Sequence, residues 1–461
     1  MKKVLLLFIL GSGPVVLSAQ VQVKPLPSPG YENRIREFID NMRVVDTHEH
    51  IMKAENLRKR TSLDFMLLLQ GYSDLRGAGL MNTSLLTKDS LSPKDKWKIL
   101  KPYWEASSNT AYHRIALLTA DKLFNVKDIN ESTVTELSEK VAKAYQTEDW
   151  INKVIEKCKI DYVIQDNLIT EHTTQRFENN KYRYAKRFDN FININSKTKI
   201  DFIGKERNKK IQTLDALVEA MAADFKKAKA EEIVCIKVGL AYARVLSFDD
   251  VSKDKAEEAF NTIMNMDERM LTFAEVKPLQ DYMMFRVLDQ AKLHNVVVQI
   301  HTGFQQYGNL VSNANPLNLF SLFKAYPTIK FVLFHGSYPY GGELSAIAKA
   351  FPNVHLDLTW IYVLSPSFSE RFLHEWLETI PASKITGFGG DYGNVENVLG
   401  HLLFAKQIIA NVLVDKVKDG YFSEAEAKNI AKMLLYDNAV NIYKLSKSDR
   451  LFPEQIYYKV P

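Results

Sequence analysis

The stretch VVDTHEH at residues 44–50 decides the fold, because it joins a short apolar run to two histidines separated by one residue. Residues two apart on a β-strand point to the same side. His48 and His50 are therefore expected to project together from the end of a first strand, where two imidazoles can supply two nitrogens to a metal ion. A His-x-His pair is a weak signal alone, since it also occurs by chance at exposed positions.

Similar apolar runs that end in polar residues recur along the whole chain. They predict eight strands, at residues 43–47, 161–165, 188–194, 233–238, 296–300, 330–334, 354–358 and 384–388. Periodic segments predict helices between them, at 211–230, 279–294 and 344–351. Alternating strands and helices indicate an α/β fold with a parallel sheet, and eight such units favour a closed (β/α)8 barrel of the TIM type. The competing doubly wound sheet is disfavoured, since no GxGxxG motif follows the first strand.

One connection is too long for an ordinary link between a strand and a helix. Residues 51–150 carry helical patterns at 63–69, 111–123 and 132–145, which predict a helical insertion after the first strand. Such an insertion either covers the active site or supports a contact between subunits. Everything from residue 31 to residue 461 is otherwise expected to form one barrel domain.

The N-terminus has the pattern of a secretory signal. Residues 1–19 combine two lysines, an apolar run and small residues before Gln20, which predicts a cleaved signal peptide and export to the periplasm or the exterior. A buried N-terminal strand or helix is the alternative. Residues 20–30 hold three prolines and are expected to be a linker. Neither a membrane span nor a disulfide framework is predicted, since the apolar run is short and broken and Cys158 and Cys235 are the only cysteines.

The composition is that of an ordinary globular protein. The 461 residues are 46% hydrophobic and 25% charged, with a net charge of +5 and no block of like charge. This distribution argues against a nucleic-acid-binding surface. A small-molecule substrate is the expected partner.

Four further side chains stand where predicted strands end. His301 and His335 follow the fifth and sixth apolar runs, Asp391 follows the eighth behind two glycines, and Lys237 closes the fourth. The C-terminal strand ends of a barrel converge on one face, which is where such folds place their chemistry. Each residue also has a structural alternative: the histidines could be satisfied core residues, the lysine could be salt-bridged, and the aspartate could cap a helix.

Four histidines and a carboxylate can hold one or two divalent ions. Zinc is the expected metal, with manganese as an alternative. A bound ion lowers the pKa of its water from ~15.7 toward ~7. Asp391 could then take the proton from that water and pass it to a leaving group.

Several stretches together resemble the amidohydrolase superfamily. The segments that carry the resemblance are QIHTGF at 299–304, ANPL at 314–317, FHGSYP at 334–339, FPNVHLD at 351–357, Gly390-Asp391, Lys237 with Tyr242 and Arg244, and the C-terminal stretch at 438–443. The chain is similar to the family-2 type, which includes relatives of uronate isomerases and amidohydrolase domains fused to glutamine-synthetase-like domains. The similarity extends over about residues 42–443 and is dense from Lys237 onward.

The resemblance implies a role for each candidate residue. His48, His50, His301 and His335 would be metal ligands, and Asp391 would be both a ligand and a proton shuttle. In two-metal members a lysine of the fourth strand is carboxylated and bridges the ions. Lys237 stands at about that place and would either do the same or contact an anionic substrate as a free amine.

Two further residues of the fourth-strand segment are candidates for binding substrate. Arg244 could bind a substrate carboxylate through its guanidinium fork, although a solvated arginine at a helix start fits the sequence equally well. Tyr242 is the second candidate.

Three functions remain open on this sequence. We favour a metal-dependent hydrolase that cleaves an amide, lactone or ester bond of a small polar substrate, since Lys237 and His335 suit activation of a bound water. A uronate-isomerase-like aldose/ketose isomerase on the same barrel is the alternative. A non-catalytic binding barrel is disfavoured, because all six candidate positions are filled. A homo-oligomer is compatible with each of these.

Overall fold

The computed structural model describes residues 28–69, 73–147, 149–166, 176–177, 179–265, 271–306 and 308–446. The predicted signal peptide and nearly all of the predicted linker lie outside these residues. Eight parallel strands form one sheet in which each strand pairs with the next along the chain. Their bounds are β1 Val44–Glu49, β2 Ile160–Asp166, β3 Tyr182–Arg187, β4 Cys235–Val238, β5 Val297–Ile300, β6 Phe331–Leu333, β7 Val354–Asp357 and β8 Ile385–Thr386.

The sheet curls into a nearly closed TIM-type barrel, as the alternating pattern predicts. Backbone hydrogen bonds cross the remaining seam between β1 and the segment after β8. Thr47 N donates to Phe388 O over 3.1 Å, and Asp391 N donates to His48 O over 2.9 Å. The second of these bonds fixes the position of two candidate site residues relative to each other.

The third strand was predicted in the wrong place. Residues 188–194 do not form a strand, and β3 is the preceding segment YRYAKR at residues 182–187. That segment is hard to recognise because charged residues alternate with its apolar ones; the Arg183 guanidinium, for example, lies 4.9 Å from the Tyr162 ring centroid. The more apolar residues 188–194 instead pack beneath neighbouring helices, and Phe188 stacks on Phe225 with the ring centroids 4.9 Å apart.

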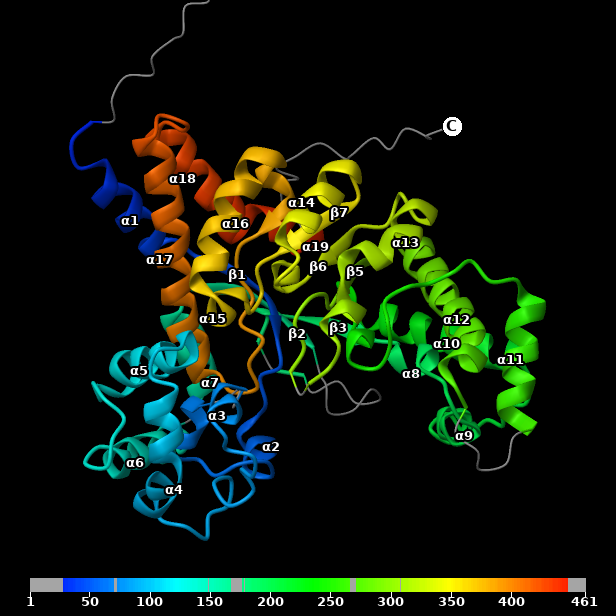
Figure 1. Ribbon diagram of the computed structural model, residues 1–461, viewed down its shortest axis with the longest axis horizontal. Helices are drawn as coiled ribbons and strands as arrows, with labels where there is room; N and C mark the ends of the chain where they lie inside the picture. Colours follow the sequence, from blue (N-terminus) through cyan, green and yellow to red (C-terminus); the bar gives the residue numbers. More distant parts are fainter. Residues whose placement is uncertain are drawn as a thin grey trace, which may run out of the picture.

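Helices surround the barrel and include the three predicted between strands (Figure 1). Their bounds are α1 Tyr31–Asn41, α2 Ala54–Arg58, α3 Ser73–Gly77, α4 Pro93–Ala106, α5 Ala111–Phe124, α6 Val134–Ala144, α7 Trp150–Lys157, α8 Asp189–Ile192, α9 Lys197–Lys205, α10 Leu214–Ala230, α11 Lys253–Asn265, α12 Phe273–Leu293, α13 Phe320–Ala325, α14 Gly341–Ala350, α15 Ile361–Leu364, α16 Pro366–Thr379, α17 Glu396–Lys418, α18 Glu424–Lys432 and α19 Asn438–Tyr443.

Helices α2–α7 lie between β1 and β2 and gather at one side of the molecule, next to the lower end of α17 (Figure 1). They have a hydrophobic core of their own, which includes Trp97 and Leu137. Two side chains fasten this group to α17, since Tyr145 and Trp150 both donate to the Glu396 carboxylate, over 3.2 and 2.8 Å. A third bond links α5 to the segment after β7, where Trp360 Nε1 donates to the Tyr112 hydroxyl over 2.8 Å.

The C-terminal helix closes the end of the barrel opposite the site. Val440 and Tyr443 of α19 pack against interior strand residues such as Val45 and Val332. The Tyr443 hydroxyl also accepts a 3.0 Å hydrogen bond from Gln299, a polar residue inside the barrel. The interior is therefore a filled core, and chemistry is confined to the other mouth.

Within the described part of the chain, one helix is long and apolar enough to cross a membrane. It is α17, with a mean hydropathy of 1.4 over its most apolar window, and 78% of that window is buried inside the protein. Burial against α1, α5 and α16 accounts for its apolar character.

Candidate metal centre

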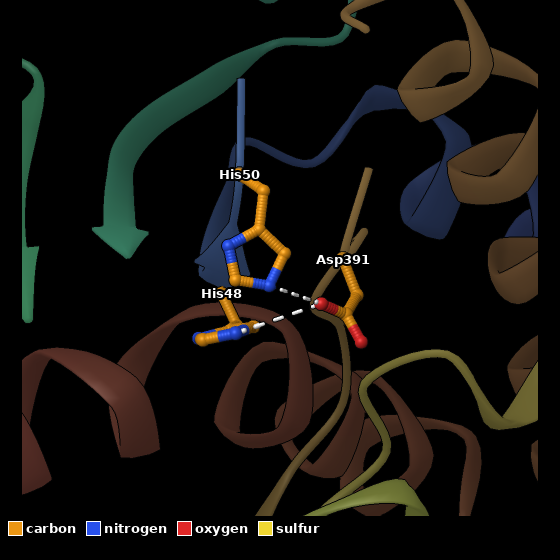
Figure 2. Close-up of side chains that lie close together, drawn as sticks. All are labelled: His48, His50 and Asp391. Atoms are coloured by element: carbon orange, nitrogen blue, oxygen red, sulfur yellow. Dashed lines mark ion pairs between the residues drawn. The ribbon is translucent and has the colours of Figure 1, made fainter. Parts of the chain in front are cut away.

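Three candidate residues meet at the mouth of the barrel (Figure 2). His48 is the fifth residue of β1, His50 directly follows that strand, and Asp391 stands in the loop after β8. Their ligand atoms all lie within 4.8 Å of one another. Asp391 Oδ1 is 3.0 Å from His50 Nε2 and 3.5 Å from His48 Nε2. The strand-end arrangement predicted from the sequence thus brings these three together.

The two glycines before Asp391 allow its backbone to approach β1 closely. A Cβ on Gly390 would overlap Glu49 Oε1, and a Cβ on Gly389 would overlap Thr359 Oγ1. Asp391 itself has a φ of 62°, in the left-handed region that non-glycine residues adopt rarely. Such a conformation at a candidate site is maintained by its surroundings, here by the backbone bond from Asp391 to His48.

The other two histidines complete the group. His335 lies two residues after the end of β6. Its Nε2 is 4.0 Å from Asp391 Oδ2 and 2.9 Å from His301 Nδ1. His301 follows β5 immediately. Both rings are buried, as is His48.

Backbone carbonyls fix the tautomers of three of these rings. Asp166 O lies 2.7 Å from His50 Nδ1, Thr359 O lies 2.9 Å from His335 Nδ1, and Phe304 O lies 3.0 Å from His301 Nε2. Since a carbonyl only accepts, each of these nitrogens carries its hydrogen. In His335 and His301 the opposite nitrogen therefore presents a lone pair toward the centre of the group, whereas His50 Nε2 faces Asp391 Oδ1.

These lone pairs face one another without a hydrogen between them. His335 Nε2 and His301 Nδ1 are 2.9 Å apart, and both are acceptors in these tautomers. An additional proton is disfavoured, because burial lowers the pKa of His335 to about 4 and holds the pKa of His301 well below its usual range. A cation relieves this repulsion, so the donor set fits a divalent metal bound by nitrogen and carboxylate oxygen.

The carboxylate has the complementary charge. Burial alone would raise the pKa of Asp391, but the hydrogen bond from His50 and the nearby histidines outweigh it and hold that pKa well below its usual range. Asp391 is therefore ionised at neutral pH. Burial, followed by the Lys237 charge, keeps the pKa of His48 well below its usual range, which leaves that ring neutral.

Lys237 lies in β4 and is buried beside this group. Its Nζ is 3.3 Å from the centroid of the Phe334 ring, and that ring packs edge-on against His48. Burial lowers the pKa of the Lys237 ammonium to about 7. A substantial fraction of this side chain is therefore the neutral, nucleophilic amine near neutral pH.

The two predicted substrate-binding residues have different surroundings. Tyr242 is 44% exposed, and its ring centroid lies 4.7 Å from that of His301, at the rim of the candidate site. Arg244 contradicts the prediction. Its side chain is 1% exposed, its Nη2 forms a 2.6 Å ion pair with Asp281, and its Nη1 donates to Gln280 over 3.0 Å. These internal bonds occupy the fork that was expected to bind a substrate carboxylate.

Sequence reasoning missed a charged pair next to the histidines. Asp166 ends β2, and its Oδ2 is 3.8 Å from His48 Nε2 and 2.7 Å from Arg187 Nη2. Arg187 ends β3, so misplacing that strand hid it. Asp166 could have been found as the carboxylate that follows the second apolar run. The Asp166 carbonyl also accepts a hydrogen bond from His50 Nδ1. The ion pair between Asp166 and Arg187 therefore fixes the position of one side of the candidate metal centre.

We expect Arg187→Met to lower the free energy of unfolding by about 3–5 kcal/mol, because the Asp166 carboxylate would remain buried without its partner. Urea denaturation of the variant measures the loss. Arg183→Met on the same strand is the control, since its guanidinium over the Tyr162 ring contributes at most about 1 kcal/mol. Equal losses of unfolding free energy in the two variants would show that the ion pair between Arg187 and Asp166 adds no more stability than the contact of Arg183 with the Tyr162 ring.

Comparison with known proteins shows what this chain is similar to. Residues 268–445 match the family model described as Amidohydrolase. The uronate isomerase of Thermotoga sp. strain RQ2 is 22% identical over 451 residues, a match that covers 89% of this chain and 96% of that protein. Over residues 268–445 the chain is therefore similar to amidohydrolases. The resemblance seen in the sequence is thereby confirmed at the level of the family-2 type.

Two further proteins are similar to this chain. The protein fluG of Emericella nidulans is 28% identical over 243 residues, which are 51% of this chain and only 28% of that protein. The crystal structure of the uronate isomerase of Thermotoga maritima matches with a TM-score of 0.74 and 19% identity, over 90% of this chain and 97% of the other. At this identity the structural match establishes the barrel fold alone.

Proposed function

We propose that this protein is a metal-dependent hydrolase of the amidohydrolase type that cleaves an amide, lactone or ester bond of a small polar substrate. The observation that carries the proposal is the pair of facing lone pairs on His301 and His335, 2.9 Å apart. Together with His48, His50 and Asp391, these residues would hold one or two divalent ions, zinc or manganese. When bound, such an ion would supply Lewis-acid polarisation and make water more acidic.

The protein's own residues then account for the proton transfers. Asp391 is ionised, and its carboxylate faces the centre of the site, so it can accept the proton of the attacking water. As the scissile bond breaks, the same carboxyl group returns that proton to the departing nitrogen or oxygen. The products are a carboxylic acid and an amine or alcohol, and one water is consumed.

Lys237 would complete a two-ion site. Its pKa of about 7 makes the neutral amine available to add carbon dioxide, which gives a carbamate and releases one proton. A carbamate has two oxygen donors and could bridge two ions. The alternative is a free amine that contacts an anionic substrate.

A uronate-isomerase-like activity is the second candidate, and a specific observation favours it. The match to the two uronate isomerases covers 88–89% of this chain and 95–96% of those proteins. In that reaction Asp391 would move a proton within a sugar acid, and no water would be consumed.

A substrate panel distinguishes the two reactions by product mass. N-acyl amino acids, dipeptides, lactones and uronates would be incubated with the purified full chain and followed by mass spectrometry. Hydrolysis of an amide or ester yields two fragments, and hydrolysis of a lactone adds the mass of one water. An isomerised uronate keeps its mass. Turnover of uronates alone, without a mass change, would overturn the hydrolase proposal.

We expect Lys237→Met to reduce bound metal from about two ions per chain to about one, because a bridging ligand is lost. Elemental analysis after reconstitution with zinc measures the ratio. Lys384→Met is the matched control, since Lys384 is another buried lysine but bonds to the Ala348 and Phe351 carbonyls away from the site. A Lys237 variant that binds as many ions as the wild type would contradict the bridging role and favour the free amine.

We also propose that the protein is exported, on the basis of the signal pattern at residues 1–19. Mass spectrometry of the mature N-terminus tests this proposal. An intact Met1 in protein recovered from the producing cells would contradict it.

A further inference from the structure

A second pocket lies outside the barrel mouth, between α8 and α9 in the connection from β3 to α10. Its volume is about 370 Å³. This falls in the range of about 300–1,000 Å³ that is usual for small-molecule sites. None of the residues that line it belongs to the candidate metal centre, so the proposed hydrolysis leaves the pocket without a role.

The polar lining of this pocket offers both acceptors and donors. Asp189 Oδ1 is buried and has no hydrogen-bond partner among the described residues. Burial raises the pKa of Asp189 to about 6, so the group is an acceptor at neutral pH. Lys199 Nζ donates to Asn193 O over 2.7 Å and keeps two further hydrogens for a ligand. The Asn190 and Asn193 side-chain amides, which also line the pocket, can donate and accept.

An aromatic ring forms part of the same wall. Phe202 of α9 lines the pocket and is 51% exposed. One carboxylate and one ammonium among the lining residues leave the pocket with no large net charge. This combination does not suit a multivalent anion or a metal ion. It suits a ligand whose hydroxyls both donate and accept and whose C–H face can cover a ring.

We propose that this pocket binds a hydroxylated ring of monosaccharide size, a sugar or a sugar acid. The ring would pack on Phe202, its hydroxyls would bond to the Asn190 and Asn193 side-chain amides, and Lys199 would donate to another hydroxyl or to a carboxylate. The site is separate from the metal centre and is independent of which reaction occurs there.

The pocket shares one wall with the barrel. Asp189 Oδ2 accepts a 2.9 Å bond from Gly239 N, which follows β4, and lies 3.8 Å from Arg187 Nη1. Replacing Asp189 would therefore disturb the barrel as well as the pocket. Phe202 and Lys199 are the cleaner positions for substitution, since both lie on α9 at the outside of the fold.

Saturation-transfer difference NMR on the full chain tests the proposal, with D-glucose and D-glucuronate as probes. The experiment uses an Asp391→Asn background, so that turnover does not consume the probe. We expect saturation transfer to at least one sugar at millimolar concentration. Phe202→Ala should weaken its binding at least about tenfold, which corresponds to 1.4 kcal/mol. Lys199→Met should weaken D-glucuronate more than D-glucose if the ammonium contacts the carboxylate.

The matched control is Lys205→Met, an exposed lysine of the same helix that does not line the pocket. It should leave binding unchanged, and an unaltered Tm of each variant shows that α9 remains folded. Absence of transfer to both sugars would overturn the proposal. So would binding that Phe202→Ala leaves unchanged, because the sugar would then occupy another place such as the barrel mouth. Neither outcome affects the proposed hydrolysis, which the metal and product analyses test separately.

Discussion

Asp391→Asn is expected to lower kcat by about 10²–10⁴-fold, the range contributed by a positioned general acid–base group. The amide has nearly the shape of the carboxylate but cannot accept a proton at neutral pH. It also removes the negative charge that faces His48 and His50 at 3.5 and 3.0 Å. The rate would be measured on whichever substrate of the panel the wild-type protein turns over.

Asp254→Asn is the control for this variant, since Asp254 is exposed on α11 and remote from the barrel mouth in sequence and fold. It should retain the wild-type rate. A fully active Asp391→Asn variant would contradict the role given to the carboxylate.

His50→Ala is expected to weaken metal binding by at least about 100-fold. That figure is the upper end of the cost of losing a residue that only orients a ligand, and here a ligand itself is removed. The ring is oriented by the Asp166 carbonyl, which leaves its Nε2 directed at Asp391. Competition against a chromogenic chelator measures the affinity.

The matched control for this substitution is His374→Ala. His374 lies on α16, is partly exposed and faces Asp415 at 3.8 Å. Its loss should leave the metal affinity unchanged. A similar small effect in both variants would show that His50 is not a ligand.

The sequence predicts the barrel well because of how parallel strands are buried. Strands β4 to β7 are covered on both faces, so they appear as apolar runs such as residues 296–300, each followed by a polar strand end. Periodicity and the position of these ends were sufficient to place His48, His301, His335 and Asp391 on one face of the fold.

The missed features depend on contacts that one sequence does not display. Three of the six residues of β3 are charged, so its apolar periodicity is weaker than that of residues 188–194 beside it. Arg244 has the composition of a substrate-binding residue, and only the position of α12 reveals that Asp281 neutralises it. Likewise, the histidine tautomers depend on backbone carbonyls such as Thr359 O. Only the fold brings these carbonyls next to the rings, so the sequence does not reveal them.

The metal content of the purified full chain tests the central claim most directly. After reconstitution with zinc or manganese and removal of excess ion, we predict about one or two tightly held equivalents per chain. We predict that a His48→Ala/His50→Ala/Asp391→Ala variant, folded by circular dichroism, retains none. A wild-type chain that binds no ion under these conditions, or a triple variant that binds as much as the wild type, would contradict the account.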